Sequence, residues 1–305
     1  MGEVHQLLLE MGKAEALKVA DNRSVVEAAA GYLATEDSEI GFIYSGWAQA
    51  ALPHKRLADD AVWEVRTGHV GLVVQPGIRM MKDGPSVSIG VPYGSRARLI
   101  LLYLQSEALR TGSRRVELGR SLRVWLGRLG IPIGGKSMRE VRDQAERLSF
   151  CRLSFQAFQG GRSGLVNQLI LDEAMFDTDG SGEGGARILE EAVLAESFFN
   201  QLKRHPVPIA EAAVRQIANN SLTLDVYCWL AYRLHVLQAP TPVSWRALHA
   251  QFGQGFRRLD NFRRTFRLCL NLALAVYPEA KVEESEQGLV LHPSKPPITK
   301  TGLLK

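Results

Sequence analysis

Between residues 116 and 171 the spacing of apolar residues changes from a helical period to an alternating one. A first helical face has the spacing i, i+3, i+4 and i+7 and ends at Gly130; its members are Leu122, Trp125, Leu126 and Leu129. A second helix is predicted from Ser137, the N-cap of a capping box with Glu140, and its buried face comprises Met138, Val141, Ala145 and Leu148. Two alternating strands, 152–158 and 165–171, then flank the polar turn 160–164.

This order, two helices and then a β-hairpin, is that of a winged helix-turn-helix, whose second helix lies in the major groove of DNA. Residues 91–170 hold fourteen Lys or Arg and five Asp or Glu, an excess of nine positive charges. A solvated surface usually mixes both signs, so this excess favours a polyanionic partner, double-stranded DNA. We expect DNA contacts from the turn, the outward side of the second helix and the tip of the hairpin, at Lys136, Ser137, Arg139, Arg142, Asp143, Gln144, Arg147 and Arg162.

The second half of the chain repeats this order of elements without detectable sequence identity. The predicted elements are helices over 208–219, 221–237 and from Ser244, a last helix over 260–277 with Asp260 as N-cap, and a hairpin of 280–284 with 289–292. The last helix and the residues before it are expected to contact DNA through Arg257, Arg258, Asn261, Arg263, Arg264 and Arg267. The hairpin carries Glu283, Glu284 and Glu286, which would repel phosphate, so we do not expect it to touch DNA.

Length and composition predict two domains, because 305 residues, 46% of them hydrophobic, exceed one comfortable core. Residues 172–196 hold eight acidic residues and one arginine, and their glycine-rich part, 177–186, is the expected linker. The predicted fold class is α+β with two tandem winged-helix domains. Its parts are an N-terminal helical arm 1–40, a first domain 41–176, the linker 177–186, a second domain 187–295 and a tail 296–305. The arm is expected to be either flexible or homodimer-forming.

The cysteines and the apolar runs indicate the cellular compartment of the protein. Three cysteines, Cys151, Cys228 and Cys269, lack Cys-x-x-Cys spacing and are expected to be reduced core thiols. No apolar run reaches the roughly 20 residues of a membrane span, and Glu3 and Glu10 interrupt any signal-peptide core. We therefore expect a cytoplasmic protein without a membrane partner.

One motif would support an enzyme instead. Residues 130–137 satisfy the Walker A phosphate-loop expression, but that loop must follow a buried strand, and 121–129 are helical in period and basic. The seven histidines show no metal-binding spacing. We expect no catalytic residues, no cofactor and no metal site, and a nucleotide-dependent enzyme stays as a disfavoured alternative.

Several short blocks occur in a fixed order between residues 41 and 292: Gly41–Trp47, Leu52–His54, Gly90–Arg98, Leu118–Ser121, Ile133–Lys136, Leu224–Leu234, Ser244-Trp245 and Phe252-Gly253. Together they resemble the RepA-type plasmid replication initiators. The resemblance implies a protein that binds repeated sites (iterons) at a plasmid origin, helps to open the duplex and recruits host replication initiation and helicase-loading proteins. It also implies repression of the protein's own gene. A winged-helix transcriptional repressor, with the same DNA contacts and no part in replication, is the alternative.

Overall fold

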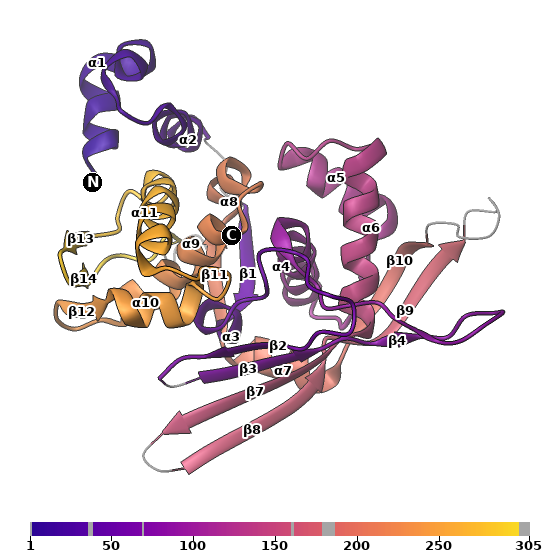
Figure 1. Ribbon diagram of the computed structural model, residues 1–305. Coiled ribbons are helices and arrows are strands. Elements are labelled where there is room, and N and C mark those ends of the chain that lie inside the picture. Colours follow the sequence, from indigo (N-terminus) through magenta and orange to yellow (C-terminus); the bar gives the residue numbers. More distant parts are fainter. Residues whose placement is uncertain (1, 36–38, 69, 160–161, 179–186, 299–305) are drawn as a thin grey trace. The chain divides into compact units, whose positions relative to one another are not determined.

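The computed structural model describes residues 2–35, 39–68, 70–159, 162–178 and 187–298 (Figure 1). Contacts divide the chain into two compact units. The central unit is residues 42–206, and the terminal unit combines residues 1–41 with 207–305. The chain passes from one unit to the other in β1 (Ile40–Tyr44) and returns in β11 (Pro206–Ala210). This division differs from the expected boundaries, because residues 187–206 stay in the central unit and the N-terminal arm packs with the C-terminal part of the chain.

Three helices carry much of the core of the central unit: α4 (Gly94–Thr111), α5 (Gly119–Arg128) and α6 (Gly135–Phe150). The six consecutive residues 99–104 of α4 are buried, so this helix is apolar on every side. Both α5 and α6 contact α4 or the strands beside it. The predicted face of α5 is buried at all four of its residues, so this prediction is confirmed.

The start of α6 differs from the prediction. Its N-cap is Gly134, and Ser137 lies inside the helix without capping it, so the predicted capping box is wrong. Two consecutive glycines allow the chain to enter the helix earlier, since Gly135 has a φ of 49°. Glu140 instead lies 3.7 Å from the Nε atom of Arg96 on α4. The expected buried stripe is confirmed at Val141, Ala145 and Leu148, whereas Met138 is half-buried.

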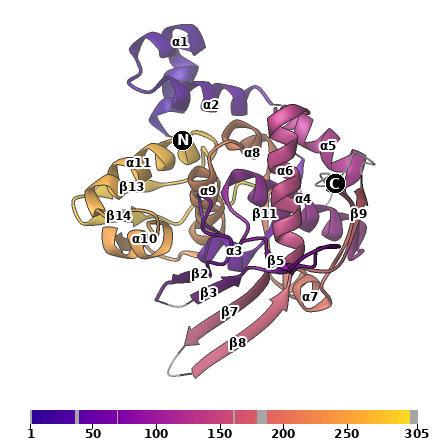
Figure 2. The ribbon, with the colours of Figure 1, turned by 45° about the vertical axis from the view of Figure 1, so that its right-hand side comes forward.

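Two antiparallel sheets organise the strands of the central unit. The three-stranded sheet has the order β6-β10-β9, from β6 (Arg115–Glu117), β9 (Leu171–Thr178) and β10 (Arg187–Leu194). The four-stranded sheet has the order β2-β3-β7-β8, from β2 (Trp63–Arg66), β3 (Val70–Gln75), β7 (Arg152–Gln159) and β8 (Arg162–Leu169). β7 and β8 form the long hairpin seen in Figures 1 and 2. The remaining elements are α3 (Ser45–Gln49), β4 (Ile78–Arg79), β5 (Val87–Ser88) and α7 (Glu196–Arg204).

The terminal unit is mostly helical. Its helices are α1 (Glu3–Val19), α2 (Arg23–Leu33), α8 (Glu211–Ile217), α9 (Ser221–Arg233), α10 (Trp245–Phe252) and α11 (Leu259–Ala275), and a short 3-10 turn (Leu234–Val236) follows α9. β12 (Thr241–Ser244), β13 (Val282–Ser285) and β14 (Gly288–Leu291) form a sheet of order β12-β14-β13. Aromatic rings fill the space between α10 and α11, where the Trp245 and Phe266 ring centroids lie 6.1 Å apart. Ser244 caps α10 as predicted, since its side chain accepts a hydrogen bond from the Ala247 amide.

The two units contain the same succession of elements. In the terminal unit the order is α9, β12, α10, α11, β13 and β14. In the central unit it is α4, β6, α5, α6, β9 and β10, with β7 and β8 inserted between α6 and β9. In both sheets the last strand lies between the other two. Each unit therefore contains a winged helix, and the predicted α+β fold with two winged helices is confirmed.

This shared topology corrects the position of the first wing. The strands predicted there do pair, as β7 and β8, but they belong to the four-stranded sheet because β7 also pairs with β3. The hairpin that corresponds to the second wing is β9–β10, which contacts α6. The expected linker 177–186 lies between these two strands, and most of it, residues 179–186, is outside the described residues. Local alternation identifies a strand, but it does not identify the strand's partner.

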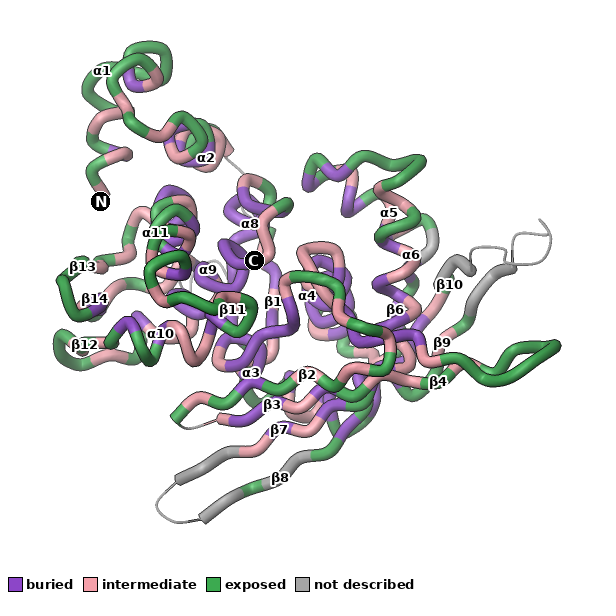
Figure 3. Tube along the Cα trace, in the orientation of Figure 1, coloured by how far each residue is buried: buried purple, intermediate pink, exposed green. Residues whose placement is uncertain are grey.

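The N-terminal arm is folded within the terminal unit. The arm is helical, as expected: it consists of α1, which has a kink at Gly12, and α2. The Nε2 atom of the buried His5 lies 2.9 Å from the carbonyl oxygen of Ala275, at the end of α11. Val26 and Ala29 of α2 are also buried, and Figure 3 shows that part of α2 is buried. α2 contacts α8 and α11, so it adds to the core behind the second winged helix.

The cysteines are all free thiols. Cys151 and Cys269 are buried and Cys228 is half-buried. Burial raises the pKa of the Cys151 thiol to about 12, so this group stays protonated at neutral pH. Among the described helices, none combines the length and the apolar character needed to cross a membrane.

Candidate nucleic-acid interface

The helices α6 and α11 occupy the position of the recognition helix in the two winged helices. On α6, Lys136 and Arg139 are exposed, as expected for residues that contact DNA. Arg142, Asp143 and Ser137 are half-buried. The exposed cations of α6 are therefore confined to its first turn and a half.

Two of the residues on α6 that were expected to contact DNA, Gln144 and Arg147, are buried, so the outward position predicted for their side chains is wrong. The Arg147 guanidinium lies 3.0 Å from Asp143 on the same helix and 3.3 Å from Asp59, and it donates to the carbonyl oxygen of Val91. It also lies over the Tyr93 ring, 5.3 Å from the centroid. Helical period alone placed these residues outward, whereas the preceding loops cover this part of the helix.

Gln144 belongs to the same hydrogen-bond network as Arg147 and Asp143. Its side-chain oxygen accepts a hydrogen bond of 2.7 Å from the Tyr93 amide, and its side-chain nitrogen donates to Asp143. Asp143 therefore receives hydrogen bonds from both Arg147 and Gln144. The half-buried carboxylate is engaged by two side chains of its own helix, which leaves it poorly suited to accept a hydrogen bond from a cytosine.

Arg162 was expected at the tip of the first wing. It begins β8 and pairs across the hairpin with Gln159. Its side chain and the connecting residues 160–161 are outside the described residues. Since the corresponding wing is β9–β10, Arg162 belongs to a different hairpin from the one expected.

On α11 the exposed residues form a basic face. Asn261 and Arg264 are exposed at a helical spacing of three, and Arg257 and Arg258 are exposed just before the helix. The helix begins at Leu259 with Arg258 as N-cap, so the prediction of Asp260 as N-cap is wrong. Asp260 lies in the first turn, 3.5 Å from the Arg258 guanidinium.

The other two arginines of α11 are held by neighbouring side chains. Arg263 is half-buried and lies over the Trp245 ring of α10, 5.5 Å from the centroid. Arg267 lies over the same ring at 5.2 Å, and its Nη2 atom is 2.5 Å from Glu284 on β13. Glu284 of the second hairpin therefore holds the side chain of Arg267 on the recognition helix α11.

The acidic segment of the central unit also neutralises nearby arginines. Arg114 lies 2.9 Å from Asp172, and Arg115 forms ion pairs with Glu173 and Glu191. These carboxylates lie on β9 and on β10, and β10 pairs with β6, the strand that carries Arg115. Part of the positive excess counted along residues 91–170 is therefore balanced in three dimensions by residues outside that range.

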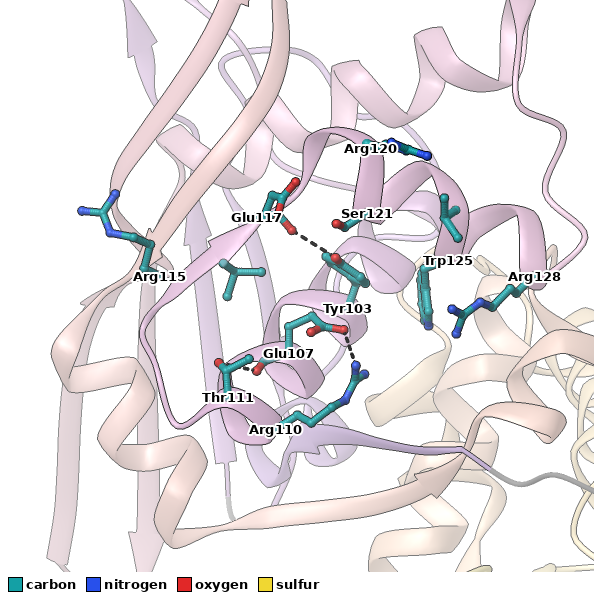
Figure 4. A pocket seen from close by; sticks show the side chains of 12 residues that line it. Tyr103, Glu107, Arg110, Thr111, Arg115, Glu117, Arg120, Ser121, Trp125 and Arg128 are labelled. Atoms are coloured by element: carbon teal, nitrogen blue, oxygen red, sulfur yellow. Dashed lines mark hydrogen bonds and ion pairs between the residues drawn. The ribbon is translucent and has the colours of Figure 1, made fainter. Parts of the chain in front are cut away.

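A pocket of about 500 Å³ lies where α4, β6 and α5 meet (Figure 4). Tyr103 and Trp125 form its aromatic wall, and their ring centroids are 5.4 Å apart. Burial and the nearby Glu107 raise the pKa of Tyr103 to about 12, so its hydroxyl remains a donor, to the carbonyl oxygen of Glu117 at 3.0 Å. Glu107 pairs with Arg110 at 2.8 Å. Both carboxylates and guanidinium groups line the pocket, and the pairing of Glu107 with Arg110 neutralises part of its positive charge.

The Walker-like residues 130–137 run from the turn after α5 into the first turn of α6. A phosphate loop leaves the end of a strand, so this loop lacks the context that its chemistry requires. Among the described residues, no group of three or more His, Cys, Asp or Glu side chains could hold a metal ion.

Two features were missed by reasoning from the sequence. The first is the β4–β5 hairpin, which presents exposed apolar residues beside α6. The sequence could have indicated this hairpin, because Met80-Met81 stand next to the turn residues Asp83-Gly84-Pro85. The second is the structural role of the Gly90–Arg98 block, in which Arg98 donates hydrogen bonds to the carbonyl oxygens of Leu52 and Gly94.

Comparisons with known proteins agree with this architecture. A structure of domains 2 and 3 of RctB, determined with SeMet derivatives, is similar in fold, with a TM-score of 0.53 and 12% identity over 83% of this chain and 99% of that chain. A second structure, of RctB domains 2-3, has a TM-score of 0.47 and 12% identity over 80% of this chain and 94% of that chain. No curated protein matches the chain.

The family comparison goes beyond the fold. The model of a family described as plasmid encoded RepA protein matches residues 91–245, which contain the first winged helix and the start of the second. The match covers half of the chain and includes most of the blocks that carry the resemblance in sequence. It supports a role in replication initiation. The chain therefore belongs to the family of plasmid-encoded RepA proteins.

Proposed function

We propose that this chain is a replication initiator that binds double-stranded DNA at repeated sites of a plasmid origin through α6 and α11. The observation that carries the proposal is the exposed basic face of α11, formed by Arg257, Arg258, Asn261 and Arg264 on a winged helix. Arginine and asparagine are the residue types that make bidentate contacts with guanine and adenine in the major groove.

The roles of the α11 residues follow from their positions. Asn261 and Arg264 lie within the helix and are proposed to contact base edges. Arg257 and Arg258 precede the helix and are proposed to contact phosphates, which fixes the position of the helix on the duplex. Arg263 and Arg267 support this face from the Trp245 side.

For α6 the proposed contacts are fewer. Lys136 and Arg139 are exposed and are proposed to contact phosphate and base edge, respectively. Arg142 is half-buried, and we propose that only part of its guanidinium reaches DNA. Gln144 and Arg147 are not among the proposed contacts, because both are buried in the network with Asp143.

Family membership extends the proposal to partners. An initiator must bring host replication initiation and helicase-loading proteins to the opened origin, and we propose such proteins as its partners. We also propose that the chain binds a second copy of itself and forms a homodimer. Repression of the chain's own gene would use the same DNA contacts.

Two experiments test the proposal. In the first, hydroxyl-radical footprinting of the full chain is carried out on DNA flanking its gene, and we expect protection of repeated sites in which a major groove faces the protein. The absence of any protected site would contradict DNA binding.

In the second, a plasmid that carries those sites but lacks its own initiator gene is supplied with this gene in trans. Replication of the plasmid is the expected result. A protein that protects the sites and lowers transcription from the adjacent promoter, but does not support replication, would be a repressor and not an initiator. The variant Arg257→Ala/Arg264→Ala, expressed to the same level, is the matched control for replication that depends on DNA contact.

A further inference from the structure

Residues 253–258 join α10 to α11, two helices that lie side by side in the terminal unit (Figures 1 and 2). This link ends in Arg257 and Arg258, the two arginines proposed to contact phosphates. Both are exposed, and the pair of Arg258 with Asp260, at 3.5 Å, is weak because both side chains are 75% exposed. The direction of these arginines therefore depends on the backbone that precedes them.

Phe256, the residue before the two arginines, is held by both of its backbone polar groups. Its amide donates a hydrogen bond of 2.8 Å to the carbonyl oxygen of Gly253. Its own carbonyl oxygen lies 3.1 Å from the Nε2 atom of His249, on α10. Because a carbonyl oxygen can only accept, the Nε2 atom of His249 is the donor and carries the proton. This second bond ties the end of the turn back to the preceding helix.

The His249 ring is itself fixed by its neighbours. It meets the ring of Phe262 on α11 edge to face, with centroids 5.1 Å apart and planes at 85°. The Phe256 ring packs on the same Phe262 ring at 5.6 Å, and Phe262 is fully buried. The His249 ring also lies against Gly253, where a Cβ would be 2.5 Å from its Cδ2 atom, so a larger residue would displace the ring.

A second histidine of the terminal unit shows what is particular to His249. The exposed His235 bonds through its Nδ1 atom to the carbonyl oxygen of Ala231, only four residues earlier. His249 is half-buried, and its bond instead crosses from α10 to the far end of the turn. The bond of His235 thus belongs to a single helical turn, whereas the bond of His249 fixes where α10 hands the chain over to the two arginines.

We propose that His249 is a positioning residue for DNA binding, which holds the turn so that Arg257 and Arg258 face the phosphates beside the groove occupied by α11. The inference rests on the proposed DNA binding and adds a residue that acts through two others. Phosphate contacts fix the register of a recognition helix on the duplex. Asn261 and Arg264 are held by α11 itself, so loss of His249 should reduce the phosphate contacts and spare the base preference.

The test uses the full chain and a duplex of about 30 base pairs, roughly three helical turns, that the wild-type protein selects from a random pool. Affinity is measured at several salt concentrations and against single-base variants of the duplex. His249→Ala should bind about three- to tenfold more weakly and lower the slope of log affinity against log salt by roughly one to two, because up to two phosphate contacts are lost. Its preference among the single-base variants should match that of the wild type.

Three further variants separate the hydrogen bond from the ring. His249→Gln keeps a donor of similar reach and should recover most of the affinity and of the salt slope. His249→Phe keeps a ring beside Phe262 but has no donor, so it should behave like His249→Ala. His235→Ala is the matched control and should change neither quantity. Urea unfolding followed by circular dichroism shows that each variant is folded under the binding conditions.

A double-mutant cycle distinguishes positioning from a general loss of stability. In the Arg257→Ala/Arg258→Ala background, His249→Ala should have no further effect on affinity, because the residues through which it acts are absent. An equal effect in both backgrounds, or an unchanged salt slope in His249→Ala, would overturn the inference. So would wild-type binding by His249→Phe, or a glutamine variant no better than the alanine one. A wild-type protein that binds no duplex would contradict the proposed function, and this inference with it.

Discussion

In the central unit, the buried Arg147 joins the recognition helix α6 to the loops before it, whereas in the terminal unit Arg263 and Arg267 of α11 lie over Trp245 of the neighbouring helix. Arginines of the recognition helix thus serve the fold in one unit and support an exposed face in the other. In α6 the exposed cations end at Arg139. At α11 they extend from Arg257, just before the helix, to Arg267 within it. If the chain binds DNA as proposed, we expect α11 to make the larger share of base contacts and α6 the larger share of positioning contacts.

The largest expected effect separates the structural arginine from the exposed ones. Arg147→Ala should lower the free energy of unfolding of the central unit by about 3 kcal/mol, because it removes a buried guanidinium that bonds Asp59, Asp143 and the carbonyl oxygen of Val91. The value stays at the low end for a buried pair, since the side chains of Asp59 and Asp143 are 40% and 42% exposed. Urea unfolding followed by circular dichroism measures it, with Arg139→Ala as the control that should leave stability unchanged. An Arg147→Ala protein of normal stability with altered base preference would reinstate Arg147 as a DNA contact.

The next prediction concerns base recognition by α11. Arg264→Ala should weaken binding to the preferred site by about 1–3 kcal/mol and relax the preference at one base position. Competition binding with single-base variants of the site measures both effects. Arg23→Ala, which removes an exposed arginine of α2 in the same unit, should leave them unchanged. If Arg264→Ala had no effect on DNA while Arg139→Ala did, the proposed division of roles between the two helices would be reversed.

A smaller effect is expected at the start of α6. Lys136→Ala should lower affinity for all sequences about equally and reduce the slope of log affinity against log salt by roughly one, because a single phosphate contact releases about one counterion. Titrations at several salt concentrations provide the slope. A change in sequence preference would mean that Lys136 reads a base. Loss of ATP binding without loss of DNA binding would restore the phosphate-loop interpretation of residues 130–137.

The smallest effect is expected at the second wing. Glu284→Gln weakens the ion pair with Arg267, whose side chain is 46% exposed, so stability should change by less than about 1 kcal/mol. DNA affinity should rise about two- to fivefold at low salt, because one negative charge is removed beside the basic face, and the gain should shrink as salt screens it. Glu27→Gln on α2 is the matched control. A loss of affinity would show that Glu284 orients Arg267 for DNA contact.

Much of the fold was predictable because it depends on local patterns. The apolar spacing of Leu122, Trp125 and Leu126 predicted α5, and the alternation after Cys151 predicted β7 and β8. Helix starts were predicted less well, since Gly134 and Arg258 occupy N-cap positions that were assigned to Ser137 and Asp260. A capping side chain is one of several ways to satisfy the first amide groups of a helix, so a favourable residue nearby does not fix the start.

The sequence predicted the kind of site, a DNA-binding surface, but it predicted only some of the residues that are exposed there. A basic helix in a winged-helix order pointed to DNA, and the family comparison agrees with a role in replication initiation. The helical period could not show that Arg147 and Gln144 are covered, because the covering residues Asp59 and Tyr93 are far away in sequence. Nor could the charge count show that Asp172 neutralises Arg114.

The sequence by itself determined the helices, the alternating strands, the winged-helix order and the family, because each of these is encoded in spacing within a few residues or in short ordered blocks. The tertiary structure alone decided which strands pair, which hairpin is the wing, that the N-terminal helices belong with α11, and which arginines of the recognition helices remain exposed. These features depend on contacts between segments that are distant along the chain. Such contacts are selected by the burial and pairing of the whole unit, and no local pattern records them.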